Sequence, residues 1–169
     1  MCRGHSRDEI LKSIRRIVVD EGNTHLMMIQ TGGPKLGAPG YTPDFTYTIG
    51  MWHNFGAPEL VMFAANPAML NTVRDKVREG MVIHPHKRYS GLAKGLDTVF
   101  AEIQKPDQIF VFTRLFYAKY GSPADRKFPR MQLVWPDEFN VFPWEDGFND
   151  HFRPAQLEVA QWPEKGAKV

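Results

Sequence analysis

The sequence predicts a single α+β domain, in which an antiparallel β-sheet of about five to six strands packs with two to three helices. Three patterns support this fold class. Apolar residues recur at helical spacing in two well-separated segments, several short segments alternate β-branched or aromatic residues with polar ones, and turn residues join these segments into sequence-adjacent hairpins. Hairpins with helices between them are typical of helices packed on an antiparallel sheet.

The first elements are a helix and a strand. Ser6 and Glu9 form the pattern of a capping box, and the apolar residues behind it repeat on one helical face, so we expect a helix over about 7–21. The apolar run 25–31 is expected as a strand. Residues 31–44 contain four glycines and three prolines, which predicts a loop.

The next segment predicts a β-hairpin followed by a helix. Residues 45–49 alternate faces with β-branched and aromatic side chains, and residues 59–64 form a second apolar run of similar length. We expect the two to pair as antiparallel strands, with 50–58 as the turn between them. Asn66 then provides an N-cap before Pro67, and the helix is expected to end at Gly80.

The second half of the chain is less regular. Residues 81–97 are expected as loop and edge strand, and 98–103 as a strand. Asp107 could cap a helix that stops at Gly121, although the Phe and Val content of that segment would also suit a strand.

The C-terminal part of the domain predicts a further hairpin. Residues 131–135 are expected as a strand, 136–140 as a turn and 141–144 as a return strand. The domain is expected to span 1–156, and the polar residues 157–169 to form a flexible tail.

Composition excludes several classes of protein. Of the 169 residues, 43% are hydrophobic and 24% are charged, which is ordinary for a globular domain. Cys2 is the single cysteine, so an intramolecular disulfide framework is excluded. The net charge of +2 does not favour nucleic acid, and the sequence has neither the apolar run of a membrane span nor a signal segment. We therefore expect a cytoplasmic protein with no membrane or nucleic-acid partner, and the oligomeric state stays open.

Motifs for metals and phosphates are weak. His84 and His86 would share one face of an extended segment, but no regularly spaced third ligand accompanies them, so no metal site is predicted. The glycine-rich loop 31–44 matches neither common phosphate-binding motif. It is expected as a plain surface loop or as a lid over a pocket, and no cofactor is predicted.

Two groups of polar and aromatic residues are better candidates for a site. Thr48 and Glu59 should lie near each other across the predicted hairpin, where the pair could bind a polar ligand or satisfy itself. Residues 135–147 hold two Trp, two Phe and four carboxylates. Tryptophan supplies a large flat surface and one N–H donor, so this segment could contact a ligand or fill the end of a sheet.

Three segments together resemble a known family. FTYTIGMWHNFGAPELVMF, LNTVRDKVREG and FPRMQLVWPDEFNVFPWEDGF are similar to the pattern of the bacterial and phage domain of unknown function 4262, over about 43–156. The resemblance implies no reaction, because the family has no assigned activity. Its motif positions are matched here by Tyr47, Thr48, Gly50, Pro58, Glu59, Asn71, Gly80, Gln132, Trp135, Pro136, Asp137, Pro143 and Trp144.

These observations favour a domain that binds a small polar or anionic molecule, with catalysis left open. Concave sites combine aromatic walls with a few polar groups. The expected ligand-binding residues are Tyr47, Thr48, Glu59, Gln132, Trp135, Asp137 and Trp144. A catalytic acid or base would be Glu59 or Asp137. The alternative is a protein-interaction module without catalytic activity, such as an immunity or anti-defence factor, in which exposed Trp and Phe would anchor a partner.

Overall fold

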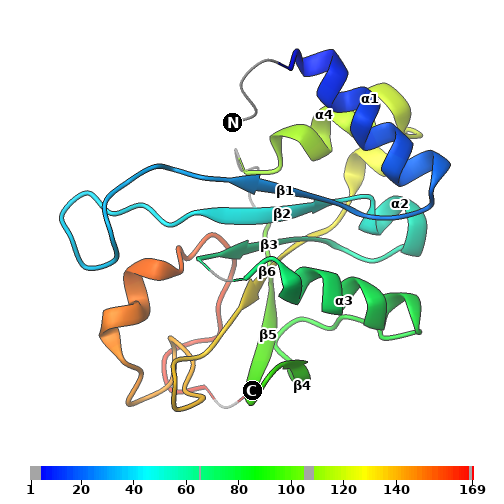
Figure 1. Cartoon of the computed structure of the whole chain (residues 1–169). Coiled ribbons are helices and arrows are strands. Elements are labelled where there is room, and N and C mark those ends of the chain that lie inside the picture. Colours follow the sequence, from blue (N-terminus) through cyan, green and yellow to red (C-terminus); the bar gives the residue numbers. More distant parts are fainter. Residues whose placement is uncertain (1–4, 65, 105–108, 168) are drawn as a thin grey trace.

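Six strands form one sheet in the order β1-β2-β3-β6-β5-β4 (Figure 1). The computed structural model describes residues 5–64, 66–104, 109–167 and 169. The α+β class and the strand number agree with the sequence-based expectation. The strands are β1 (His25–Ile29), β2 (Phe45–Ile49), β3 (Glu59–Phe63), β4 (Arg88–Ala93), β5 (Leu96–Glu102) and β6 (Arg130–Val134).

The sheet is mostly antiparallel, but it contains a parallel pair. The expected hairpin of β2 and β3 is present, with Phe45 opposite Phe63 and Tyr47 opposite Val61. β1 and β2, β4 and β5, and β5 and β6 also pair antiparallel. β3 and β6 pair in parallel, so the sheet is mixed. The carboxyl ends of β3 and β6 therefore lie at the same edge.

The three main helices form where the sequence predicts them. α1 (Arg7–Arg15) continues as the π-helical turn η1 (Arg16–Asp20), and Ser6 and Glu9 form the capping box. The Asn66 side chain accepts the N–H of Ala68 at the start of α3 (Ala68–Arg78). Residues 111–120 form the helix α4 (Val111–Tyr120), not a strand, and the expected cap Asp107 lies outside the described residues. Within the described part of the chain, no helix is long and apolar enough to cross a membrane.

Helices cover both faces of the sheet (Figure 1). On one face, Ile14 of α1 and Phe116 of α4 belong to a cluster that includes Tyr47 of β2. On the other face, Leu70 and Val73 of α3 pack in a second cluster with Leu60 of β3. Because both faces carry apolar side chains, the central strands are buried, and polar residues on them need partners inside the protein.

Two sequence-based expectations were wrong. The segment 50–58 is not a simple turn but contains the short helix α2 (Met51–Phe55). Asn54 fixes this helix by donating hydrogen bonds to the carbonyl oxygens of Val18 and Asn23. Residues 141–144 form no return strand. β6 is paired with β3 on one side and β5 on the other, so it offers no free edge to a following strand.

The segment after residue 156, expected as a flexible tail, lies against the sheet. It follows two 3₁₀ turns, η2 (Asp125–Lys127) before β6 and η3 (Asp150–Ala155) after it. The Gln161 N–H donates to the Glu102 carbonyl, and the Gly166 N–H donates to the Trp144 carbonyl. The same segment also contacts a polar side chain of β6.

Candidate functional site

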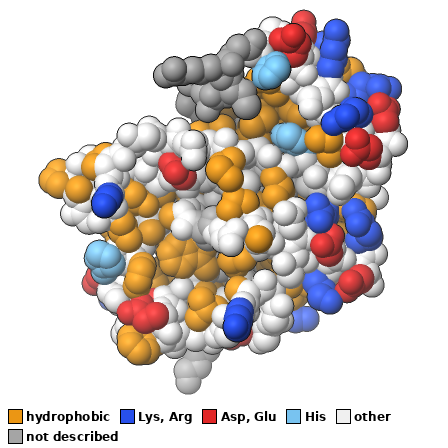
Figure 2. Space-filling view, viewed as in Figure 1, with side chains coloured by type: hydrophobic (Ala, Val, Ile, Leu, Met, Phe, Trp, Pro, Cys, Tyr) orange, Lys and Arg blue, Asp and Glu red, His pale blue; other side chains and the backbone are white. Residues whose placement is uncertain are grey.

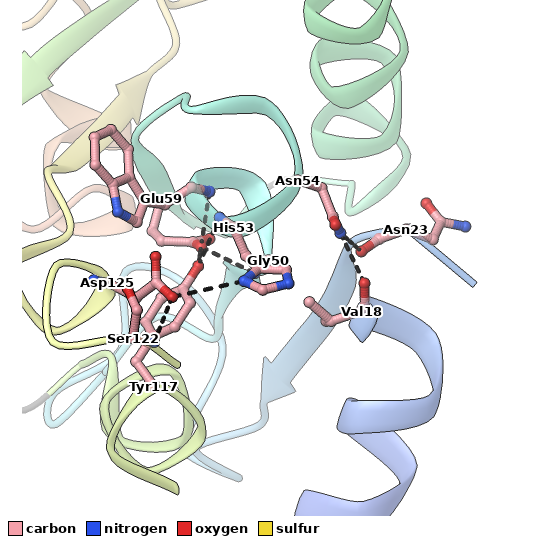
Figure 3. Close-up of polar contacts among 10 residues, drawn as sticks. Val18, Asn23, Gly50, His53, Asn54, Glu59, Tyr117, Ser122 and Asp125 are labelled. Carbon is pink, nitrogen blue, oxygen red and sulfur yellow. Dashed lines mark hydrogen bonds and ion pairs between the residues drawn. The ribbon is translucent and has the colours of Figure 1, made fainter. Parts of the chain in front are cut away.

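Thr48 and Glu59 lie side by side, as their places in the hairpin predict. Glu59 is fully buried, and its Oε2 accepts a hydrogen bond of 2.5 Å from the Thr48 hydroxyl. Its Oε1 accepts from the backbone N–H groups of Gly50 and Trp52 and from the Tyr117 hydroxyl (Figure 3). The carboxyl group thus joins β2, β3, α2 and α4 at one point.

The electrostatics of this cluster follow from its burial. Burial raises the pKa of Glu59 above its ordinary value, and the four hydrogen-bond donors act in the opposite direction. Burial, followed by the neighbouring Glu59 carboxyl group, also raises the pKa of Tyr117. The Tyr117 hydroxyl therefore keeps its proton and remains a donor to Glu59.

Glu59 connects to the surface through Tyr117 and His53. The backbone N–H of His53 donates to the Tyr117 hydroxyl, while the His53 imidazole is 30% exposed and lies 3.7 Å from Asp125 (Figure 3). Asp125 also accepts the backbone N–H of Ser122. These contacts hold α2 against the C-terminal end of α4, and the carboxyl group of Glu59 itself meets no solvent.

Gly50 is required at this junction for two reasons. Its φ of 107° lies in the region that favours glycine, and its N–H is one of the Glu59 donors. A Cβ atom at this position would lie 2.7 Å from a methyl carbon of Val18. The close approach of η1 and the β2–α2 junction therefore depends on the missing side chain.

Gln132 anchors the C-terminal segment. It is fully buried on β6, and its Nε2 donates to the carbonyl oxygen of Leu157 at 2.7 Å. Its Oε1 accepts from the Trp162 indole and from the Val159 N–H. The amide is thus used by the protein itself, at the place where the chain after 156 crosses the sheet.

Asp137 and Trp144 organise the loop after β6. The Asp137 carboxylate accepts the backbone N–H groups of Phe139, Val141 and Asn149. The Trp144 ring is buried and stacks on Phe142, with ring centroids 5.0 Å apart. Asp137 therefore fixes the backbone of the loop, and Trp144 fills the core beneath it.

The remaining two expected ligand residues differ in exposure. Tyr47 is buried, its hydroxyl accepts the Phe112 N–H, and burial raises its pKa to about 12. Trp135 is partly exposed, and its indole N–H donates to the Phe63 carbonyl at the end of β3. The seven residues thus fall into separate groups rather than around one cavity, and Trp135 is the member that lines a hollow.

Two hollows meet at Ala64, directly after β3. The larger has a volume of about 400 Å³ and lies between the 31–44 loop and the edge where β2 begins and β3 ends. Its polar lining residues are Thr31, Thr42, Asp44 and Thr46, and its apolar ones include Met28, Phe45 and Pro67. The smaller, of about 170 Å³, is bounded by Met69, Leu96 and Trp135.

The surface around β2 and β3 carries many apolar side chains. Figure 2 shows hydrophobic side chains gathered over the middle and left of this face, with charged side chains mainly along its right margin. Met28 is about half exposed at the edge of the larger hollow. The sequence did not single out these lining residues. Its one signal was the glycine-rich loop 31–44, which was expected as a plain surface loop or as a lid over a pocket.

Ala64, which lines both hollows, has a strained backbone. Its φ is 46°, in the left-handed region that non-glycine residues rarely adopt. The Ala64 N–H donates to the Asp44 carbonyl at 2.8 Å, which ties the end of β3 to the base of the 31–44 loop. Such strain persists only where the surrounding structure imposes it, and it is concentrated at functional sites.

The geometry defines the class of protein: an α+β domain with a mixed sheet, a buried carboxyl cluster at one end of β3 and an open hollow at the other. Comparison with known families then identifies its family. The sequence model of the family described as a domain of unknown function, DUF4262, matches residues 20–149, so the chain belongs to this family. The match begins earlier than the resemblance over 43–156 suggested. Neither a curated protein nor a solved structure matches the chain.

Proposed function

We propose that the protein binds a small polar molecule in the larger hollow, at the carboxyl end of β3. The observation that carries the proposal is the hollow itself. Its volume of about 400 Å³ lies in the range of small-molecule sites, about 300–1,000 Å³. Its lining combines aromatic and aliphatic walls with several hydroxyl groups and a carboxylate, which is the composition such sites need.

The position of the hollow supports the same function. In open α/β sheets, ligands bind outside the carboxyl ends of the parallel strands. β3 and β6 are parallel here; Ala64, directly after β3, lines the larger hollow, and Trp135, directly after β6, lines the smaller one. The strained backbone of Ala64 lies at this position as well.

The contacts of Glu59 and Asp137 favour ligand binding in the larger hollow over catalysis by either of these two residues. Glu59 and Asp137 have their carboxyl oxygens occupied by donors from the protein, and neither lines the two hollows. We therefore assign them to the framework of the domain, with the hollow as the place where a ligand is held.

A matched pair of variants tests the proposal. Thr42 is exposed and lines the hollow, so Thr42→Trp fills it, whereas Ser13→Trp adds the same side chain on the exposed face of α1. A library of polar fragments is screened by protein-observed NMR against wild-type protein and both variants. We expect hits that shift resonances of the 31–44 loop and are lost in Thr42→Trp but kept in Ser13→Trp. Hits that survive in Thr42→Trp, or no hits at all, contradict the proposal.

One observation favours the alternative of a protein-interaction module. Phe139 is 76% exposed, on a turn whose backbone Asp137 fixes. A rigidly presented aromatic side chain is a common anchor at interfaces. Under this alternative, Phe139→Ser would abolish the binding of a partner protein and leave the fragment titration unchanged.

A further inference from the structure

The charges of the side chains that line the larger hollow favour some classes of ligand over others. Of the described residues that line it, Asp44 is the one with a charged side chain, and the others are apolar or neutral polar. Among the described residues, the lining includes no lysine, arginine or histidine that could balance a bound anion. An anionic ligand, which the sequence left open, would therefore face a carboxylate at close range.

One oxygen of Asp44 remains available to a ligand. Oδ1 accepts the N–H of Thr31 at 2.7 Å and the Thr31 hydroxyl at 3.1 Å. Among the described residues, Oδ2 accepts no hydrogen bond. The contacts through Oδ1 hold the carboxylate at the base of the loop, so that Oδ2 is presented from a fixed position.

An aromatic ring lies beside this carboxylate. Tyr41 lines the hollow, whereas the Phe45 ring packs on Tyr47 and Phe63 in the core. Burial, together with the nearby charge of Asp44, raises the pKa of Tyr41, so its ring stays neutral. A neutral aromatic ring attracts cations through its face, so a ring beside a carboxylate favours an ammonium group.

We propose that the ligand of this hollow carries an ammonium group, held by Asp44 beside the Tyr41 ring. The inference rests on the proposed function, since it names the chemical class that the same hollow takes. The Thr31, Thr42 and Thr46 side chains would then contact the neutral polar part of the ligand. Selection against anions follows from the same carboxylate.

The test uses three probes of similar size and different charge. Phenethylammonium, phenethyl alcohol and 3-phenylpropionate are titrated into the full-length protein and followed by NMR at resonances of the 31–44 loop. Asp44→Asn removes the charge and keeps an oxygen that can accept from Thr31. Asp20→Asn, at the exposed end of η1, makes the same change in net charge away from the hollow and serves as the matched control.

We expect wild-type protein to bind the ammonium probe most tightly and the carboxylate probe most weakly. Asp44→Asn should weaken binding of the ammonium probe about fivefold, the effect of one partly exposed charge pair, and leave the alcohol unchanged. Asp20→Asn should behave as wild type. Equal binding of the ammonium and alcohol probes, or equal effects of the two variants, overturns the inference.

The two proposals fail in different ways. If fragments bind in a manner that Thr42→Trp blocks, but without preference for ammonium, the hollow is a binding site and the charge assignment is wrong. If no probe or fragment binds in a manner that Thr42→Trp blocks, both proposals are wrong.

Discussion

Replacement of Glu59 tests whether the buried carboxyl cluster holds the domain together. Glu59→Ala removes the acceptor of four donors, of which the Gly50 and Trp52 N–H groups belong to the backbone and cannot turn away. A buried donor left without a partner costs about 1–3 kcal/mol, so these two alone predict a loss of about 2–6 kcal/mol. We therefore expect the unfolding free energy of Glu59→Ala to be only slightly above zero.

Glu59→Gln is the matched control. Its carbonyl oxygen can replace Oε1 and accept from Gly50, Trp52 and Tyr117. Its amide NH₂ then faces the Thr48 hydroxyl, which accepts the Leu60 N–H, has one lone pair left and must turn its own proton away. The glutamine variant should therefore lose about 1 kcal/mol or less, the net value of one hydrogen bond.

Urea unfolding at neutral pH measures the difference. With a denaturant slope of about 2 kcal/mol per molar, a gap of 2 kcal/mol between the variants separates their midpoints by about 1 M. Equal midpoints for Glu59→Ala and Glu59→Gln would refute the reasoning, because the number of orphaned donors would then have no effect on stability.

Three further predictions concern Glu59, Ala64 and Gly50. Burial raises the pKa of Glu59 above its unfolded value of 4.5, so the stabilisation that the protonated carboxyl group contributes is present below pH 4.5 and is lost as the pH rises through the folded pKa. The unfolding free energy of wild type, relative to that of Glu59→Gln, should therefore fall as the pH rises from 4.5 through the folded pKa, and a rise would show that the hydrogen-bond donors outweigh burial. Ala64→Gly relieves a left-handed φ worth about 1–2 kcal/mol at an entropy cost of about 0.5–1 kcal/mol, a net gain of about 0–1.5 kcal/mol. The midpoint of thermal unfolding should therefore rise by up to about 6 °C, and a fall would argue against strain. Gly50→Ala places a Cβ atom 2.7 Å from Val18 at a φ of 107°. Chemical denaturation should therefore show an unfolding free energy lower by at least about 2 kcal/mol, and an unchanged value would mean that η1 can move away.

Local patterns predicted most of the elements because their causes are local. The capping box of Ser6 and Glu9 starts α1 through contacts three residues apart. The alternation in β2 and the length of β3 predicted their hairpin, and the hairpin brought Thr48 next to Glu59. In each case the residues that interact lie close in sequence, so spacing alone carries the information.

Long-range contacts decided the rest. The parallel pairing of β3 and β6 joins strands separated by α3, the β4–β5 hairpin and α4. This pairing also removed the edge that a return strand at 141–144 would need. Tyr117 reaches Glu59 from 58 positions away. The sequence could not show that Glu59 has four donors, because Gly50 is the N-cap of α2, Trp52 lies in α2 and Tyr117 lies in α4.

The sequence by itself determined the fold class, most of the elements and the pairing of Thr48 with Glu59, because periodicity, caps and hairpin spacing act over a few residues. Only the tertiary structure decided which polar residues meet solvent. A carboxylate beside tryptophan has the same sequence pattern in a core as in a pocket, and packing directed Gln132 and Asp137 towards backbone donors and acceptors. The same packing left Asp44, unremarkable in sequence, at the wall of a hollow, since burial depends on which distant segments come together.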